Sequence, residues 1–151
     1  MAQPLRRDVG VDALETRARI SVRTRGPAYQ AYLLLYAAFI AAPLIAGLDK
    51  FFDMLAPWSN YLAPMIAGML PVTPHTFMMA VGGVEVIAAL VVAARPSIGG
   101  YLVAAWLGGI VVNLLLARGF YDIALRDFGL MLGALALARL ATQFERTSVR
   151  P

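Results

Sequence analysis

The chain of 151 residues contains no cysteine and only one histidine, His75. The absence of cysteine excludes disulfides, thiol redox chemistry, iron–sulfur clusters and cysteine–zinc sites within this chain. A single histidine also excludes a bis-histidine haem, and we expect no metal site. Any redox role of this protein would therefore depend on electron carriers supplied by another molecule.

Charged residues are scarce as well. They make up 15% of the chain, against 60% for hydrophobic residues, and the mean hydropathy is +0.71. A soluble domain of this length would be nearer half apolar, so the composition predicts an all-α integral membrane protein. The net charge is +4, but the positive residues are concentrated in the terminal segments. We attribute them to membrane topology and expect no binding of nucleic acid.

Four apolar segments are about long enough to cross a bilayer as helices, because a span takes ~20 residues. They cover residues 31–52, 76–94, 98–117 and 121–141. We therefore predict a four-helix membrane bundle over residues 28–141. A basic N-terminal tail (1–27) precedes it and a polar C-terminal tail (142–151) follows it.

The segment between the first two spans, residues 55–74, is too short and too rich in proline to cross the membrane. Its apolar residues repeat at helical spacing from Trp58 and Tyr61 to Met69, which predicts an interfacial helix. Trp58 and Tyr61 would lie at the level of the lipid headgroups. A re-entrant lid over the bundle is the alternative interpretation.

Four spans would put both tails on the same side of the membrane. That side, with the turn at Arg95, carries most of the 13 Lys and Arg residues. The positive-inside rule then predicts that both termini are cytoplasmic. The N-terminal tail would fix this orientation, or would bind lipid headgroups or a partner.

Glu85 lies near the middle of the second span, where an acidic side chain costs roughly 2.5 kcal/mol or more. Such residues usually face a bundle interior, a partner or a water-filled cavity. The topology places the other polar residues of the spans in the outer half: Asp49, Lys50, Asn113, Arg126 and Asp127. We predict that Lys50 or Arg126 forms an ion pair with Glu85. The remaining cation would pair with Asp49 or Asp127.

Three interpretations of this cluster remain open on the sequence alone. The ion pairs would fix the order and rotation of the helices, line an outward-facing pocket for a quinone or lipid, or form a docking site for another membrane subunit. We interpret Asn113 as the donor or acceptor of an interhelical hydrogen bond, and His75 as a loop residue near the membrane interface.

Small residues at a spacing of four permit close helix approach in membranes. The third span contains such a series at Gly100, Ala104 and Gly108, and the fourth contains Gly129 and Gly133. We predict helix packing at both sites, either within the bundle or against a second chain.

Three short motifs resemble those of the DoxX-like family of small four-helix membrane proteins. They are G-L-D-K-F at residues 47–51, G-G-V-E at 82–85 and R-D at 126–127. The resemblance covers about residues 30–141 and assigns Gly47 and Lys50 to the first motif, Gly82 and Glu85 to the second, and Arg126 and Asp127 to the third. It implies a prokaryotic cytoplasmic (inner) membrane and a link to quinone-dependent oxidation of sulfur compounds or to membrane oxidoreductase assemblies. Some related proteins carry redox cysteines, which this chain lacks.

These observations predict an accessory subunit of a respiratory or redox membrane assembly, with no covalent cofactor. It would contact the bilayer and either other membrane subunits or a second copy of itself. Its outer pocket would hold a quinone or a lipid. One alternative is a quinone-reactive oxidoreductase subunit in which Glu85 exchanges protons while a bound partner supplies the electrons. Another is a small-solute or proton transporter.

Overall fold

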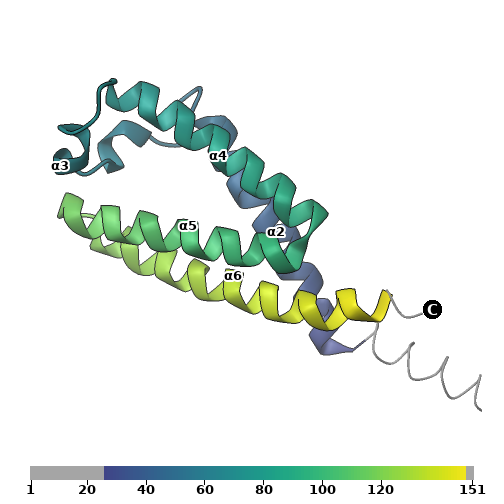
Figure 1. Ribbon diagram of the computed structural model, residues 1–151. Coiled ribbons are helices and arrows are strands. Elements are labelled where there is room, and N and C mark those ends of the chain that lie inside the picture. Colours follow the sequence, from purple (N-terminus) through teal and green to yellow (C-terminus); the bar gives the residue numbers. More distant parts are fainter. Residues whose placement is uncertain (1–25, 149–151) are drawn as a thin grey trace, which may run out of the picture.

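The computed structural model describes residues 26–148, which form helices and turns and no strand. The four long helices are α2 (Pro27–Asp49), α4 (Pro74–Ala94), α5 (Pro96–Ala117) and α6 (Tyr121–Ser148). Two short helices, η1 (Trp58–Tyr61) and α3 (Pro64–Ala67), lie between α2 and α4 (Figure 1). Nearly all of the predicted basic tail falls on residues 1–25, outside the described part of the chain.

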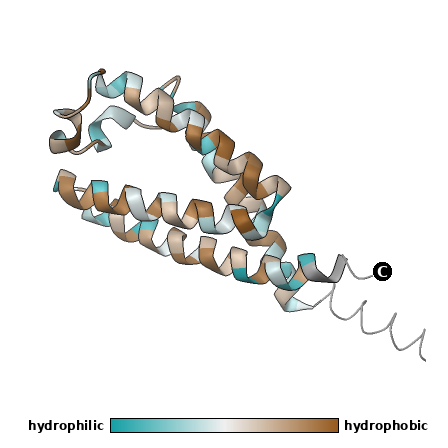
Figure 2. Cartoon of the chain, viewed as in Figure 1, coloured by the Kyte–Doolittle hydropathy of each residue, from teal (hydrophilic) through white to brown (hydrophobic). Residues whose placement is uncertain are grey.

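Three of the long helices, α2, α4 and α5, are long and apolar enough to cross a membrane. Hydrophobic residues recur along these helices (Figure 2), and many of the large ones are exposed. Examples are Leu34, Ile87 and Ile98, which are 73%, 60% and 57% exposed. Exposed apolar surface on this scale indicates a lipid bilayer environment. The predicted fourth span, α6, is not among these three helices, because charged residues interrupt it.

Proline starts three of the long helices, at Pro27, Pro74 and Pro96. The fixed φ of proline suits the first helical position, where the missing N–H would have no partner in any case. Thr73 caps α4 by accepting a hydrogen bond from the backbone N–H of Thr76, at 3.2 Å. These signals place the helix starts two to four residues earlier than the hydropathy pattern predicts.

The helix α6 continues beyond residue 141, the predicted end of the fourth span, and takes in most of the polar C-terminal tail up to Ser148. Two contacts stabilise this extension. The Phe144 ring lies 5.2 Å from the ring of Tyr29 and 5.3 Å from that of Tyr32 in α2. The Glu145 carboxylate accepts hydrogen bonds from the backbone N–H and hydroxyl of Ser97. A carboxylate there also complements the positive end of the α5 dipole.

The long helices pack as two hairpin-like pairs, α2 with α4 and α5 with α6. The pairs meet at the tight turn at Arg95 and diverge toward the opposite end (Figure 1). The buried core lies where they meet and consists of Phe39, Ala88, Val92, Val103, Ala104, Ala134 and Leu137. The η1–α3 segment lies at the diverging end.

Gly100 and Ala104 pack inside the chain. A Cβ atom at Gly100 would lie 2.9 Å from the Ala134 carbonyl oxygen of α6, and Ala104 is 4% exposed. Gly108 is looser, since its Cβ would lie 3.5 Å from the Met131 sulfur. The predicted packing face of the third span is thus occupied by α6.

Of the second small-residue pair, Gly129 and Gly133, only Gly133 packs against another helix. A Cβ at Gly133 would lie 3.2 Å from the Phe39 ring of α2, which is a close packing contact. A Cβ at Gly129 would have no heavy atom within 4 Å. Gly129 therefore borders open space and does not pack against a helix.

The prediction of a single interfacial helix over residues 55–74 is wrong. The helical turn η1 ends at Tyr61, because Leu62 and Ala63 adopt extended ψ angles of 125° and 132°. Pro64 follows Ala63 directly, and the helical conformation is unfavourable for a residue that precedes a proline. Leu62 is 7% exposed whereas Met69 is 80% exposed, so the apolar repeat does not form one face.

Candidate functional site

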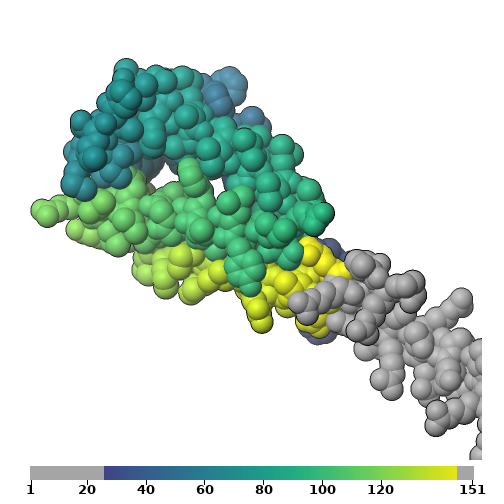
Figure 3. Space-filling view, in the orientation of Figure 1, coloured from purple at the N-terminus to yellow at the C-terminus, as the bar shows by residue number. Residues whose placement is uncertain are grey.

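A cavity of about 780 Å³ lies between the α2–α4 and α5–α6 pairs, closed on one side by the η1–α3 segment. The space-filling view shows openings between these elements (Figure 3). Most lining residues are apolar. The lining residues whose side chains carry a polar atom are Lys50, Trp58, Tyr61, Glu85, Trp106, Asn113, Arg126 and Asp127. A largely apolar cavity with a few convergent polar groups is the usual form of a small-molecule site, and its volume falls in that range.

Lys50 is the cation that pairs with Glu85. Its Nζ atom lies 2.6 Å from Glu85 Oε2, and the two side chains are only 5% and 8% exposed. The same Nζ lies 3.7 Å from the centre of the Trp58 ring and 3.5 Å from the Ala46 carbonyl oxygen. The acidic residue in the middle of α4 is thus neutralised by a buried partner, as its cost in an apolar span requires.

Two glycines bring this ion pair together. Gly47 precedes Lys50 by three positions and Gly82 precedes Glu85 by three, so each glycine shares a helix face with its charged residue. A Cβ at Gly82 would lie 2.5 Å from the Gly47 carbonyl oxygen, and one at Gly47 would lie 2.7 Å from the Gly82 oxygen. The backbones of α2 and α4 therefore touch beside the ion pair. In the sequence these glycines stand out only through the family motifs, although each also lies three positions before its charged residue.

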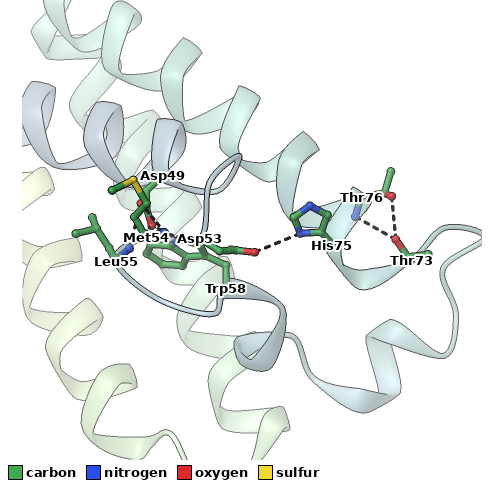
Figure 4. A network of polar contacts seen from close by, with 8 residues as sticks. All are labelled: Asp49, Asp53, Met54, Leu55, Trp58, Thr73, His75 and Thr76. Carbon is green, nitrogen blue, oxygen red and sulfur yellow. Dashed lines mark hydrogen bonds and ion pairs between the residues drawn. The ribbon is translucent and has the colours of Figure 1, made fainter.

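Asp49 binds no cation among the described residues, because the remaining cation, Arg126, pairs with Asp127, the other carboxylate that the prediction named. Its carboxylate accepts hydrogen bonds from Trp58 Nε1 at 2.7 Å and from the backbone N–H groups of Met54 and Leu55 (Figure 4). These bonds fold the chain back after α2. They also hold the Trp58 ring over the Lys50 ammonium group.

Asn113 does form the predicted kind of bond, but its partner is not another long helix. Its Oδ1 accepts a hydrogen bond from Ala63 N at 3.0 Å, and its Nδ2 donates one to the Tyr61 carbonyl oxygen at 2.7 Å. The Tyr61 ring in turn packs edge-on against Phe120, with centroids 5.1 Å apart. Asn113 thereby ties the η1–α3 segment to α5.

Arg126 pairs with its neighbour Asp127, with Nε and Oδ1 3.2 Å apart. The pair differs from the first one in burial, since the Arg126 side chain is 68% exposed and that of Asp127 is 10% exposed. Both residues line the cavity. Of the two cations proposed for Glu85, only Lys50 reaches it.

Trp106 is a site residue that the sequence analysis missed. Its Nε1 atom is buried and has no hydrogen-bond partner among the described residues, and the residue lines the cavity. Its place halfway along α5 was an available signal, because tryptophans of the interfacial belt lie near helix ends.

His75 lies outside this site. It occupies the first turn of α4 and not a loop, contrary to the prediction. Its Nδ1 atom lies 3.4 Å from Asp53 Oδ2 (Figure 4). The contact joins the segment after α2 to the start of α4, and neither residue lines the cavity.

Comparison of the chain with family models, with curated proteins and with solved structures found no match in any of the three. The DoxX-like resemblance therefore stays a prediction.

Proposed function

We propose that this protein binds an amphiphile, a quinone or a lipid, in the cavity between its helix pairs. It would serve as a non-catalytic accessory subunit of a membrane redox assembly. The observation that carries the proposal is the cavity itself. Apolar side chains from the long helices would contact a hydrocarbon tail, and Lys50 and Glu85 offer polar contacts to a headgroup.

Ligand binding is better supported than docking of a partner chain. The small-residue faces of the third and fourth spans were the reason to expect docking. Other helices of this chain already cover Gly100, Ala104, Gly108 and Gly133. Gly129, with open space at its Cβ, lines the cavity. Membership of a redox assembly rests on the family resemblance. With no cysteine and one histidine, the chain would act there by holding a ligand rather than by carrying electrons.

We also propose that α6 is a fourth span and that both termini are cytoplasmic, in a prokaryotic inner membrane. The Arg95 turn and both ends of the described chain lie at the same end of the molecule (Figure 1). Because the native chain has no cysteine, single cysteines can report topology. An impermeant maleimide should label Asn60→Cys in intact cells and Ala94→Cys only after lysis. The reverse pattern would refute the orientation.

Ligand binding can be measured through the chain's own fluorescence. Trp58 and Trp106 are the only two tryptophans, and both line the cavity. Titration of the purified protein in detergent with a decyl-tailed benzoquinone should quench this fluorescence in a saturable way. Quenching that is linear, as for free tryptophan in the same micelles, would contradict the proposal.

Two glycine variants provide a matched test of where the ligand binds. Gly129 lines the cavity and Gly83 does not, and a Cβ at either would meet no atom within 4 Å. Gly129→Leu should fill the cavity and abolish saturable quenching, whereas Gly83→Leu should retain it. Both changes remove a helical glycine and so raise helix propensity equally. Equal binding by the two variants would place the ligand elsewhere.

A further inference from the structure

The charged residues that line the cavity sum to zero. They are Lys50, Glu85, Arg126 and Asp127, and each cation already contacts a carboxylate. A phosphate headgroup would add a negative charge to a cavity whose charges already balance, and of the two cations only Arg126, which is 68% exposed, has N–H groups left to meet it. Taking Lys50 from Glu85 would leave a buried carboxylate without its partner, which is strongly unfavourable. The charge balance therefore favours a headgroup that carries no net charge.

Trp106 adds a second, independent indication. A buried N–H group without an acceptor is rare in folded proteins, and each case requires an explanation. The Nε1 atom of Trp106 is such a group among the described residues, and Trp106 lines the cavity. An oxygen atom of a bound molecule would provide the missing acceptor once the indole ring turns its Nε1 atom toward the cavity, because that atom is closed to a water-sized probe as it lies.

Trp106 and the ion pair lie at the same depth. The helices α4 and α5 run in opposite directions from the turn at Arg95. At ~1.5 Å per residue, Glu85 lies about 15 Å before this turn and Trp106 about 16 Å after it. Both line the cavity, from different helices. One headgroup at this depth would lie between the walls that carry them.

From these observations we infer that the cavity selects an amphiphile with an uncharged headgroup that bears an acceptor oxygen, and that Trp106 donates a hydrogen bond to that oxygen. The inference rests on the proposed ligand binding and specifies the class of ligand. Carbonyl-bearing rings and uncharged glycerides satisfy it, whereas anionic phospholipids do not.

The test compares Trp106→Phe with Trp58→Phe in the full-length protein. Each variant keeps an aromatic ring at the changed position and leaves one tryptophan as the reporter. The decyl-tailed benzoquinone is titrated by quenching. Decylbenzene, which has the tail but no oxygen, and an anionic lysophosphatidylglycerol are then measured as competitors.

Trp106→Phe should weaken binding of the quinone about three- to tenfold, the usual worth of one net hydrogen bond. The affinity of decylbenzene should not change, and the lysophospholipid should compete poorly. Quinone affinity within about twofold of the wild type in Trp106→Phe would overturn the inference, although saturable binding would still support the proposed function. The inference would also be overturned if the lysophospholipid bound more tightly than the quinone and lost this affinity in Arg126→Met. If no compound binds in a saturable way, both the inference about Trp106 and the proposed function are refuted.

Discussion

Replacing Lys50 by methionine should destabilise the protein strongly. The change leaves the Glu85 carboxylate without its only hydrogen-bond partner among the described residues. Removing one member of a buried ion pair typically costs about 3–5 kcal/mol, against about 0–1 kcal/mol for a solvent-exposed pair. The side chains are 5% and 8% exposed, so the larger range applies here.

Lys50→Met is one variant of a double-mutant cycle on the Lys50–Glu85 pair. The same contacts predict the stabilities of the other two variants. Glu85→Gln should cost less, about 1–3 kcal/mol, because Lys50 keeps the Trp58 ring and the Ala46 carbonyl oxygen. The double variant Lys50→Met with Glu85→Leu removes both charges and should regain most of the lost stability, since apolar replacements of a buried pair are often neutral.

The assay is equilibrium unfolding in mixed micelles of increasing SDS fraction, monitored by circular dichroism. Arg126→Met is the control, because the Arg126 side chain is 68% exposed; it should cost no more than about 1 kcal/mol. The reasoning would be refuted if Lys50→Met cost as little as this control. It would also be refuted if the double variant were as unstable as the two single changes added together.

Two further changes test the surroundings of the site. Gly82→Val should cost more than about 3 kcal/mol in the same unfolding assay, because its Cβ would lie 2.5 Å from the Gly47 backbone oxygen; Gly83→Val, with open space at its Cβ, should cost under about 1 kcal/mol, and equal effects would disprove the close approach. Asn113→Leu should cost about 1–3 kcal/mol and speed hydrogen exchange at Ala63, because two hydrogen bonds to the η1–α3 segment are lost. Unchanged exchange there would show that Asn113 does not hold this segment.

The pairing at the centre of the site was largely predictable. A carboxylate in the middle of an apolar helix requires a partner, and helix order places Lys50 and Arg126 as candidates. The sequence does not choose between them, because the choice depends on where α2 touches α4. That contact is set by Gly47 and Gly82, whose closeness arises only when both backbones are in place.

The segment between α2 and α4 was predicted poorly for a different reason. Helical periodicity from Trp58 to Met69 suggested one amphipathic helix, but the conformation required before Pro64 interrupts it. Side chains from other elements then supply the fixing bonds. Asp49 binds Trp58, and Asn113 binds the backbone around Ala63. Such partners, distant in sequence, leave no periodic pattern.

The cavity itself leaves no pattern in the sequence, because it arises where two helix pairs diverge. The proposal that the cavity holds an uncharged amphiphile is tested most directly by an experimental structure of protein purified from its native membrane. We predict continuous non-protein density beside Glu85 that reaches Trp106 within hydrogen-bonding distance of Nε1. A cavity closed by collapsed side chains, or one filled by a phosphate headgroup, would contradict this account.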